Sequence, residues 1–573
     1  MKKFILAFAA AIVLTVAVKG EVGDSFIQDN LKFTVLTEDD SPSVDVAPID
    51  KSLSGDIVIP ATVTNGTTTY SVTTILKTSF RYCSYISSIT IPSTVITIEN
   101  NSFNRCTSLT SFDVDDQNQV FCSIDGVIYS KDKTQLMFYP VGREGAFSVP
   151  EGVTSIAMDA FHSAFNLSEI SIPETVKTIE GTAFFFCSNL KTVDIPASVE
   201  HMDDAVFGVC SMLTEINVSE NNLNYKSIDG VLYNFDIDTL LQYPPSKKGE
   251  ILIPESVVSI GEFSFADCDQ IRTAWIKNSY TITPVGNAFT YCRNLMDYEC
   301  EENSTRFKVM DGVLCNSSTT EIIAYPAGRS DIYIIPSTFK SLRSNTFRGG
   351  RISGLVIPES ITTMQGQCFM DCSELRKIID LSKTPQNISS NTFCRVCPEV
   401  CVIVPQGCKE TYENEWHKFE NTNFEIREAD GIVVALNSYE ARIEPGESIV
   451  LKAEVVEFDD SEIKSQVWTS SNPAVASVDD TGKVTAVGNG QATITFTATN
   501  NNNKSDSEDC LITVTPDAAV ISIEADETNS INFDRQYLVY DLYGKIISDS
   551  IHNVLPGLYI VRQGGKAVKI IVK

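Results

Sequence analysis

Basic residues, histidine and tryptophan are scarce in this chain. Its 573 residues include four histidines and three tryptophans, and 44 lysines and arginines stand against 74 aspartates and glutamates, which gives a formal net charge of −30. An acidic surface of this kind repels phosphate backbones and anionic lipid headgroups. The composition therefore argues against nucleic acid and membrane surfaces as partners, and the charge also serves simple solubility.

The common catalytic motifs are missing as well. The sequence contains no His-Glu-x-x-His, no Gly-x-Ser-x-Gly and no phosphate-binding glycine loop with a lysine. The four histidines lie in separate parts of the chain, at His162, His201, His417 and His552. We predict a protein without catalytic residues, metal or cofactor. A hydrolase with two distant carboxylates is an alternative, although nothing singles out such a pair.

Long apolar runs are confined to the N-terminus. Lys2 and Lys3 precede an apolar stretch over residues 4–18, and Gly20 follows shortly after it. This order is typical of a secretory signal peptide, which we place at residues 1–20. The stretch is shorter than the roughly 20 apolar residues that a membrane span requires, and no later stretch approaches that length. We expect an exported chain without a transmembrane segment, outside the cell or on its outer surface. Its net charge is −33 after the loss of three lysines.

A template that repeats every 23 residues occupies most of the chain. One copy reads Pro173, Val176, Ile179, Phe184, Cys187, Leu190, Val193 and Ile195, and the same offsets recur from Pro92, Pro150, Pro196, Pro254 and Pro358. The copy that starts at Pro336 slips by one residue near Gly349. A unit this short cannot bury its own apolar side, so successive units must stack on one another. The template therefore predicts a solenoid.

Within each copy, the segment Leu-x-x-Ile-x-Ile-Pro predicts a short strand, because it alternates in polarity and ends at a proline. Stacked copies would form a parallel ladder with a spacing of roughly 4.8 Å. The whole pattern resembles the BspA-type leucine-rich repeat of bacterial surface proteins, over roughly residues 56–425. We assign residues 56–427 to a leucine-rich repeat solenoid and residues 21–55 to an N-terminal cap.

Three segments interrupt the array in a common style. Each holds an Asp-Gly pair between two alternating runs, and these pairs start at Asp125, Asp229 and Asp311. A Tyr-Pro pair follows further on, at Tyr139, Tyr243 and Tyr325. Asp-Gly indicates a tight hairpin, because both turn positions favour positive φ. A calcium loop would need denser acidic residues. We expect β-hairpins inserted between coils, as in BspA-type arrays.

Residues 430–516 carry short alternating runs separated by polar turns, which is typical of an all-β sandwich. The stretch that begins at Trp468 and continues through Gly482 to Val484 resembles the bacterial immunoglobulin-like domain, group 2. We expect Trp468 in the core of this domain and the domain itself to act as a spacer.

Residues 520–573 resemble the C-terminal sorting domain of type IX secretion substrates in Bacteroidetes-like bacteria. The resemblance rests on segments 539–545, 555–561 and 564–573, and it implies export or attachment through the secretion machinery. The alternative is a terminal β-module that caps the chain. The predicted fold is thus a repeat solenoid, followed by an immunoglobulin-like sandwich and a small C-terminal β-domain.

Cysteine is plentiful, with sixteen residues. Seven share one template position, which Ala164 fills in another copy: Cys83, Cys106, Cys187, Cys210, Cys268, Cys292 and Cys372. Buried cysteine behaves as a small hydrophobic residue, so we predict buried thiols there rather than disulfides. A separate cluster comprises Cys394, Cys397, Cys401 and Cys408. For this cluster, simple packing, a disulfide, and a zinc or redox site stay open.

The outward positions of the stacked strands form the candidate binding surface, which we expect to be one continuous face. Short hydroxyl and carboxylate side chains predominate on it. The seven candidate residues are Thr90, Asp113, Ser171, Asp194, Asn217, Trp275 and Glu299. Trp275 is the one large aromatic residue, and it can anchor an interface, stack on a sugar or shield the neighbouring hairpin.

These features predict a secreted or cell-surface, non-enzymatic binding protein. The BspA resemblance implies an adhesin that recognises a host extracellular-matrix or cell-surface protein, or another bacterial surface, through the repeat face. The rival interpretation is a carbohydrate-binding accessory protein of the cell envelope.

Overall fold

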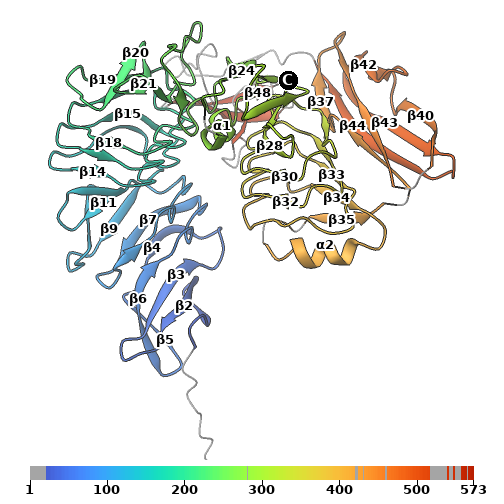
Figure 1. The fold of residues 1–573 in the computed structure, drawn as a ribbon. Coiled ribbons are helices and arrows are strands. Elements are labelled where there is room, and N and C mark those ends of the chain that lie inside the picture. Colours follow the sequence, from blue (N-terminus) through green and yellow to red (C-terminus); the bar gives the residue numbers. More distant parts are fainter. Residues whose placement is uncertain are drawn as a thin grey trace, which may run out of the picture. The chain divides into compact units, whose positions relative to one another are not determined.

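Figure 1 shows the computed structural model of the protein as a ribbon. It describes residues 21–515, except 281, 420, 421, 423, 430, 459 and 460, and four further strands after residue 537. The signal peptide predicted at residues 1–20 lies outside the described residues. The chain divides into two compact units. The N-terminal unit is Met1–Gly328 with Arg343–Gly349, and the C-terminal unit is Arg329–Leu342 with Gly350–Lys573.

The strand predicted from Leu-x-x-Ile-x-Ile forms in most coils of the N-terminal unit. These strands carry what we call the repeat face: β4 (Ser54–Val58), β7 (Tyr85–Ile91), β9 (Ser111–Val114), β13 (Gly145–Ser148), β15 (Leu167–Ser171), β17 (Thr192–Ile195), β19 (Glu215–Val218), β24 (Thr273–Ile276) and β25 (Asp297–Cys300). They pair in parallel from one coil to the next, in the groups β4-β7-β9, β13-β15, β17-β19 and β24-β25. In β17, Val193 and Ile195 are buried while Thr192 and Asp194 are exposed, as the alternation predicts.

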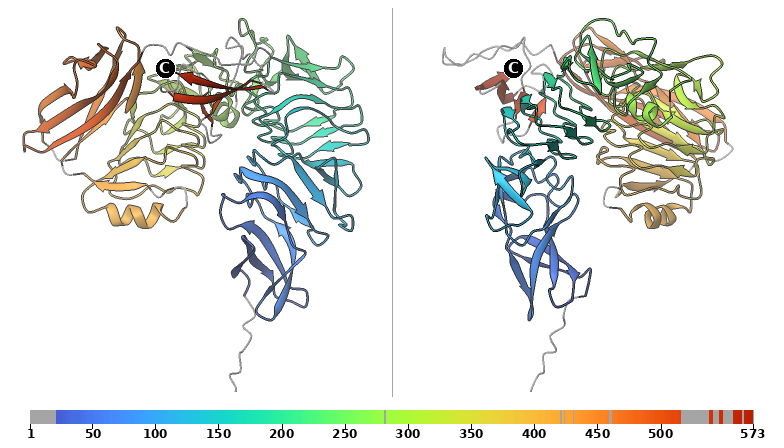
Figure 2. Two further views of the ribbon diagram at one scale, coloured as in Figure 1. Left: turned by 180° about the vertical axis from the view of Figure 1, so that it is seen from behind. Right: turned by 60° about the vertical axis from the view of Figure 1, so that its left-hand side comes forward.

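A second ladder comes from the Val-x-x-Ile segment after each proline. Its strands in this unit are two residues long: β8 (Thr97–Ile98), β14 (Ser155–Ile156), β16 (Thr178–Ile179), β18 (His201–Met202) and β23 (Ser259–Ile260). Strands β14, β16 and β18 pair in parallel, with Ile156, Ile179 and Met202 in register. The two further views in Figure 2 show the short strands stacked along the coils.

One aromatic ring per coil fills the interior between the two ladders. The ring centroids of Phe161 and Phe184 are 4.8 Å apart, and those of Phe184 and Phe207 are 5.5 Å apart. These separations match the roughly 4.8 Å spacing between paired strands. Because the three rings are buried, the phenylalanine positions form a continuous core, and the predicted solenoid is confirmed.

The template cysteines line the same core. All seven are buried, as predicted, and the structure joins none of the sixteen cysteines, which all lie in its described part, in a disulfide. The Cys187 thiol donates to the Phe161 carbonyl of the preceding coil at 3.3 Å, and the Cys210 thiol donates to the Phe184 carbonyl at 3.2 Å. Burial raises the pKa of Cys210 to about 12. These thiols therefore act as small neutral core residues that also link coils.

The three Asp-Gly segments form hairpins followed by a third strand. Their strands are β10 (Phe121–Ile124), β11 (Val127–Ser130) and β12 (Gln135–Phe138); β20 (Tyr225–Ile228), β21 (Val231–Asn234) and β22 (Thr239–Gln242); and β26 (Phe307–Met310), β27 (Val313–Asn316) and β28 (Glu321–Ala324).

The antiparallel hairpins β10–β11, β20–β21 and β26–β27 form between coils, as we expected, but the third strand of each segment belongs to the coil array. Strand β12 pairs in parallel with β14, and β22 pairs in parallel with β23. Tyr139 stacks on Phe161 at 4.7 Å, and Tyr243 stacks on Phe265 at 5.5 Å. The part of each segment that follows the hairpin is therefore a further coil, in which the third strand replaces Val-x-x-Ile and the tyrosine of Tyr-Pro replaces the phenylalanine.

On the turn side of the coils, residues two positions before and after the phenylalanine adopt positive φ. Thr182 and Phe186 have φ of 55° and 63°, a conformation that costs a non-glycine residue roughly 1–2 kcal/mol. The N–H groups of Phe184 and Phe186 donate to carbonyls of the next coil at 3.0 Å each. These hydrogen bonds between coils offset the cost of the left-handed residues.

Turn-side rings of this unit meet across several coils. The centroids of Phe186 and Tyr291 are 5.7 Å apart, although the coils of Phe207, Tyr243 and Phe265 lie between them in the chain. A straight stack would separate these two positions by roughly 19 Å, at about 4.8 Å per coil. The coils of the N-terminal unit therefore bend, with the turn side innermost.

Arginine side chains complete this cluster, which we call the turn hub and define as Arg105, Phe185, Phe186, Phe263, Tyr291 and Arg348. The Arg348 guanidinium lies 4.9 Å from the Phe263 ring, and its Nε donates to the Tyr291 hydroxyl at 2.9 Å. Arg105 lies 4.7 Å from the Phe186 ring. Stacking of guanidinium groups on aromatic faces stabilises both partners where water is excluded.

The N-terminal cap merges with the first coil. Its sheet has the order β1-β2-β3-β6-β5, with strands β1 (Ser25–Gln28), β2 (Leu31–Thr37), β3 (Ser43–Pro48), β5 (Thr62–Asn65) and β6 (Thr68–Ile75). Strand β6 pairs in parallel with β8 of the second ladder. The apolar interior of the coils is thereby closed at this end.

The C-terminal unit begins with the last coils. Its face strands form one parallel sheet: β29 (Ile332–Ile334), β31 (Gly354–Ile357), β33 (Lys377–Asp380), β34 (Cys401–Val404) and β35 (Glu425–Glu428). Its second ladder holds β30 (Ser341–Leu342) and β32 (Thr363–Met364). Helix α2 (Lys409–Trp416) packs Trp416 on Phe393 at 5.5 Å, while α1 (Ile282–Ala288) belongs to the N-terminal unit.

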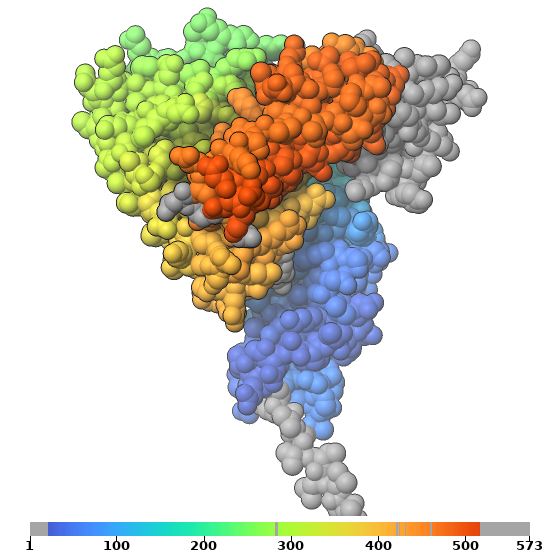
Figure 3. Space-filling view, turned by 90° about the vertical axis from the view of Figure 1, so that its right-hand side faces the viewer, coloured from blue at the N-terminus to red at the C-terminus, as the bar shows by residue number. Residues whose placement is uncertain are grey.

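Two further β-domains complete this unit. The immunoglobulin-like domain faces the viewer, in orange, in Figure 3. Its sheets are β36-β39, β37-β44-β43-β40 and β38-β42-β41. The strands are β36 (Ile432–Leu436), β37 (Glu440–Ile443), β38 (Ser448–Val450), β39 (Ala453–Glu457), β40 (Ile463–Ser470), β41 (Ala476–Val478), β42 (Lys483–Ala486), β43 (Gly490–Asn500) and β44 (Ser505–Val514). Trp468 packs on Phe496 at 4.7 Å but is only partly buried, so it lies at the margin of the predicted core.

The last sheet has the order β46-β45-β47-β48, with β45 (Leu538–Tyr540), β46 (Ile546–Ser548), β47 (Gly557–Gln563) and β48 (Lys566–Val572). The rest of the predicted sorting domain at 520–573 lies outside the described residues. The predicted fold class, a solenoid followed by two β-domains, is confirmed.

Candidate binding face of the repeats

All seven predicted site residues lie in one row of the repeat face, which we call the outer column. Its members are the outward residues between the last two inward positions of each face segment. In chain order they are Val58, Thr90, Asp113, Ser148, Ser171, Asp194, Asn217, Leu252, Trp275 and Glu299 in the N-terminal unit, and Ile334, Val356, Ile379, Ile403 and Arg427 in the C-terminal unit.

Strand register brings these residues together in pairs. The register partners are Thr90 with Asp113, Ser148 with Ser171, Asp194 with Asn217, and Trp275 with Glu299. The Asn217 amide donates to the Asp194 carboxylate at 3.0 Å. Adjacent parallel strands thus hold short polar groups roughly 4.8 Å apart on a rigid backbone.

The middle of the outer column is polar and mostly exposed. Asp113, Ser171, Asp194 and Glu299 are exposed, while Thr90 and Asn217 are half-buried. At the start of the face, the hydroxyls of Ser87 and Ser88 donate to Asp56 at 2.8 and 2.7 Å. These bonds lower the pKa of the Asp56 carboxyl. The row therefore offers negative charge and hydrogen-bond acceptors to a partner.

The Asp-Gly turns divide this face. The Phe112 N–H of β9 donates to the Gly126 carbonyl, and the Ile216 N–H of β19 donates to the Gly230 carbonyl, both at 2.9 Å. Each turn thereby takes the place of the next strand beside β9 or β19. The continuous face that we expected is wrong: the turns interrupt it after β9 and after β19, and β15 and β17 of neighbouring coils are also not joined in one sheet.

An apolar patch interrupts the polar row. Leu252 is 71% exposed and Trp275 is 53% exposed. Their coils are neighbours, because Tyr243 stacks on Phe265. After the other two hairpins, the corresponding strand pairs with its successor, as in β13 with β15 and β29 with β31. Residues 251–253 instead form no strand, which leaves β24 paired in the described structure only with β25.

In the C-terminal unit the middle of the outer column is apolar and covered, whereas Ile334 and Arg427 at its ends are exposed. Val356, Ile379 and Ile403 are 3%, 0% and 6% exposed. They form one cluster with Val433 and Ala435 of strand β36. The immunoglobulin-like domain therefore packs on the repeat face of the last coils, and the expectation that it acts as a spacer is wrong.

Polar contacts fix the position of β36 on this face. The Lys377 ammonium donates to the Val434 carbonyl at 2.7 Å and forms an ion pair with Glu508. The Ser353 hydroxyl donates to the Leu436 carbonyl at 3.4 Å. Alternate residues of β36 are divided between two cores, because Val434 and Leu436 belong to the core of the domain itself.

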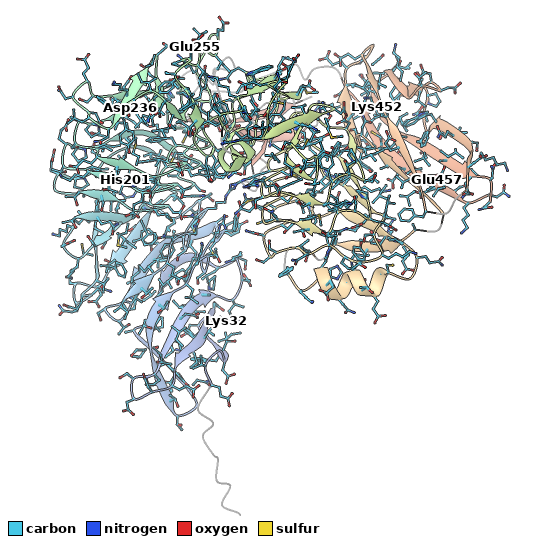
Figure 4. The ribbon with its side chains drawn as sticks, in the orientation of Figure 1. Lys32, His201, Asp236, Glu255, Lys452 and Glu457 are labelled. Carbon is cyan, nitrogen blue, oxygen red and sulfur yellow. The ribbon has the colours of Figure 1, made fainter. Side chains whose placement is uncertain are left out.

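Other chemistry is sparse in the described part of the chain. No group of three or more His, Cys, Asp or Glu side chains there is arranged to hold a metal ion. His201 lies at the surface, as labelled in Figure 4, with its Nε2 2.8 Å from Asp203. In the predicted cysteine cluster, Cys394 and Cys401 are half-buried and Cys397 and Cys408 are buried, all as free thiols. Among the described helices, none is long and apolar enough to cross a membrane.

Sequence reasoning missed the turn hub. Its residues lie within two positions of the template phenylalanine, outside the apolar offsets that define the repeat. The available signal was the recurrence of aromatic and arginine residues directly after the phenylalanine position, at Arg81, Tyr82, Arg105, Phe185, Phe186, Tyr291 and Arg348.

Comparison with known families agrees with this geometry. The model of the BspA type leucine rich repeat region matches residues 61–124, 137–241, 246–333 and 329–425, in six copies. The model of the bacterial Ig-like domain (group 2) matches residues 433–507. An uncharacterised protein of Clostridium acetobutylicum is 36% identical over 89 residues, which is 15% of this chain and 21% of that protein. The chain thus spans about a fifth of the length of this relative.

Three solved structures are similar to the chain. A leucine rich cell surface protein from Faecalibacterium prausnitzii is 24% identical, with a TM-score of 0.33 over 62% of this chain and 94% of that one. The pneumococcal vaccine antigen PcpA is 20% identical, with a TM-score of 0.32 over 72% and 100%. A leucine-rich repeat protein from Bacteroides ovatus is 20% identical, with a TM-score of 0.27 over 71% and 100%.

Proposed function

The chain belongs to the BspA-type leucine-rich repeat family, and from this premise we propose that it is an exported, non-enzymatic protein that binds a protein partner. The binding surface is the polar stretch of the outer column in the N-terminal unit. The partner is a host extracellular-matrix or cell-surface protein, or a protein on another bacterial surface. In this role the chain is an adhesin.

One observation carries this proposal: the exposed polar residues of the outer column are held in register on paired strands. Such residues contribute nothing to the core, since Asp194 is exposed while its neighbours Val193 and Ile195 are buried. Rigid, preorganised groups lose little conformational entropy when a partner binds. Their carboxylates favour a partner with basic side chains, because complementary charge guides encounter and register.

The test is a binding screen of the mature chain against purified matrix and cell-surface proteins. The variant Asp194→Ala with Asn217→Ala removes the centre of the row, and we expect binding to weaken about tenfold or more. The matched control is Glu200→Ala with His201→Ala, which changes two exposed residues at the second ladder. Equal loss in both variants, or no loss in either, contradicts the proposed surface.

A second candidate function rests on Trp275. An exposed tryptophan beside an acidic residue, here Glu299, can stack on a sugar ring and hydrogen-bond its hydroxyls. If the chain binds envelope or host glycans, Trp275→Ala abolishes signal on a glycan array and leaves binding to proteins intact. The opposite pattern favours the adhesin.

Export is the remaining part of the proposal. The positive, apolar and small-residue segments of residues 1–20 support secretion, and the resemblance at 520–573 supports sorting by the type IX machinery. A version that ends at Pro516 should accumulate inside the cell envelope, whereas the full chain should reach the outer surface. Equal surface exposure of both versions would leave residues 520–573 as a terminal cap.

A further inference from the structure

The covered part of the outer column shows which kind of segment this face binds when its residues are apolar. Strand β36 lies on Val356, Ile379 and Ile403 through the alternate residues Val433 and Ala435. Two donors from the face, the Lys377 ammonium and the Ser353 hydroxyl, reach carbonyls of the same strand. The occupant is therefore a strand with small apolar residues on one side and accessible carbonyls.

In the N-terminal unit, the Leu252–Trp275 patch has the same position in the repeat as this covered column, but its side chains are exposed. Trp275 has the template position of Ile379, and Leu252 has the same position one coil earlier. One donor has a counterpart: Thr273 stands where Lys377 stands. The counterpart of Ser353 is Gly249, which has no side-chain donor, but Arg272 directly precedes Thr273 and adds a second donor. Leu252, Arg272, Thr273 and Trp275 are all exposed.

Strand β40 of the immunoglobulin-like domain shares two features with this occupant, an exposed small apolar side chain at Val467 and a position at the edge of its sheet. It is the last strand in the order β37-β44-β43-β40, and Figure 1 shows it at the edge of this sheet. Trp468 points inward to Phe496, so the alternate residues Ser465 and Val467 point outward. Val467 is 50% exposed. An exposed edge strand of this kind offers unpaired backbone groups and small apolar side chains to another chain.

We propose that β40 of one copy docks on the Leu252–Trp275 patch of a second copy, so that the protein associates head to tail. Val467 covers Trp275 as Ala435 and Val433 cover the column of the last coils. The Arg272 guanidinium and the Thr273 hydroxyl donate to carbonyls of β40. The two surfaces differ, so the contact is heterologous and leaves one patch and one strand available at the ends of each assembly.

Self-association of this kind holds whatever external partner the polar stretch binds. Thr90, Asp113, Ser171, Asp194 and Asn217 lie outside the patch, so an assembly still presents them. Copies joined in series would present several such rows together, and linked sites increase avidity without any new contact to the partner.

The test is sedimentation velocity of the mature chain alone over a range of concentrations. Wild type should show a weight-average mass that grows with concentration beyond a dimer. Trp275→Ala removes the patch and Val467→Lys removes the strand, and each should sediment as a monomer. Both side chains are at least half exposed, so neither change should unfold the protein. Matched controls are Val58→Ala on the same column, 67% exposed, and Val487→Lys on the same domain, 55% exposed.

A mixture of the two variants gives the decisive result. The Val467→Lys chain keeps an intact patch and the Trp275→Ala chain keeps an intact strand, so the mixture should form a one-to-one dimer that grows no further. A monomeric wild type overturns the proposal, and so does a mixture that stays monomeric. Association that survives Trp275→Ala also overturns it. These outcomes involve no host molecule, so they leave the proposed adhesin function untouched.

Discussion

At the residue scale, Asp380 departs from the repeat in an informative way. It occupies the inward position that Ile357 holds in the preceding coil, and it is fully buried. Its Oδ1 accepts hydrogen bonds from the Ser382 N–H at 3.0 Å and from the Gln386 amide at 3.1 Å. Burial nevertheless dominates and raises the pKa of this carboxyl to about 7. The side chain is therefore better tolerated neutral than charged.

The substitution Asp380→Asn should stabilise the protein at pH 8 by about 1–3 kcal/mol. The unfolded carboxyl ionises near pH 3.8, whereas the folded one keeps its proton up to about pH 7. The contribution of this carboxyl to stability therefore falls as pH rises through this window, and the asparagine variant lacks that loss. Thermal unfolding at pH 4 and pH 8 measures the difference, with exposed Asp113→Asn as control. An equal shift at both pH values would assign the effect to packing instead.

At the scale of elements, the strands of the solenoid were predictable because apolar offsets and a terminal proline mark each one. The coils that contain hairpins were not recognised, because tyrosine replaces phenylalanine in the template, at Tyr139 for example. The Asp-Gly pair at Asp125 predicts that the chain turns there, but it does not predict which strand the turn will hydrogen-bond. That partner, the backbone of β9, is decided by packing between coils.

Replacing Gly126 should test how closely this turn approaches the face. Gly126 has φ of +68°, and a Cβ there would lie 2.6 Å from the Arg143 guanidinium and 3.2 Å from the Ser111 Cα. Gly152 has φ of +95°, but a Cβ there would meet nothing within 4 Å. In both alanine variants the left-handed backbone should lower the free energy of unfolding by about 1 kcal/mol. Only in Gly126→Ala should overpacking lower the free energy of unfolding by roughly a further 1–3 kcal/mol, the usual cost of an added methyl group in a filled space.

Chemical denaturation in urea gives the two free energies of unfolding. A larger loss for Gly126→Ala supports the close contact between turn and strand. Equal losses would mean that the turn lies away from β9 and that the hydrogen bond between Phe112 and Gly126 contributes little.

At the scale of the whole molecule, the sequence carried less information, because the decisive contacts join distant residues. The sequence around Val433 does not predict its contact with Ile379, and the sequence around Arg348 does not predict its contact with Phe263. The candidate residues of the outer column were predictable from template offsets. Which of them the immunoglobulin-like domain covers was not, since both the polar and the apolar stretches have the same strand pattern.

The bend of the N-terminal unit makes a sharp energetic prediction. Phe186 and Tyr291 make a T-shaped contact at 5.7 Å, although four steps of the coil array separate them. A double-mutant cycle with Phe186→Leu and Tyr291→Leu should therefore show a coupling of about 0.5–1.5 kcal/mol, the usual value for an aromatic pair. Phe289 provides the control, because it lies in the same coil as Tyr291 but stacks on Phe265 in the interior at 5.0 Å.

Phe186→Leu combined with Phe289→Leu should be additive within about 0.5 kcal/mol, since the two rings share no contact. Urea unfolding of the full chain supplies all the free energies, and each leucine keeps an apolar side chain in place, which limits cavity effects. A straight stack would place Phe186 and Tyr291 too far apart to interact, so an additive cycle for this pair would contradict the turn hub. It would also remove the physical reason for the curvature of the coils that carry the polar row.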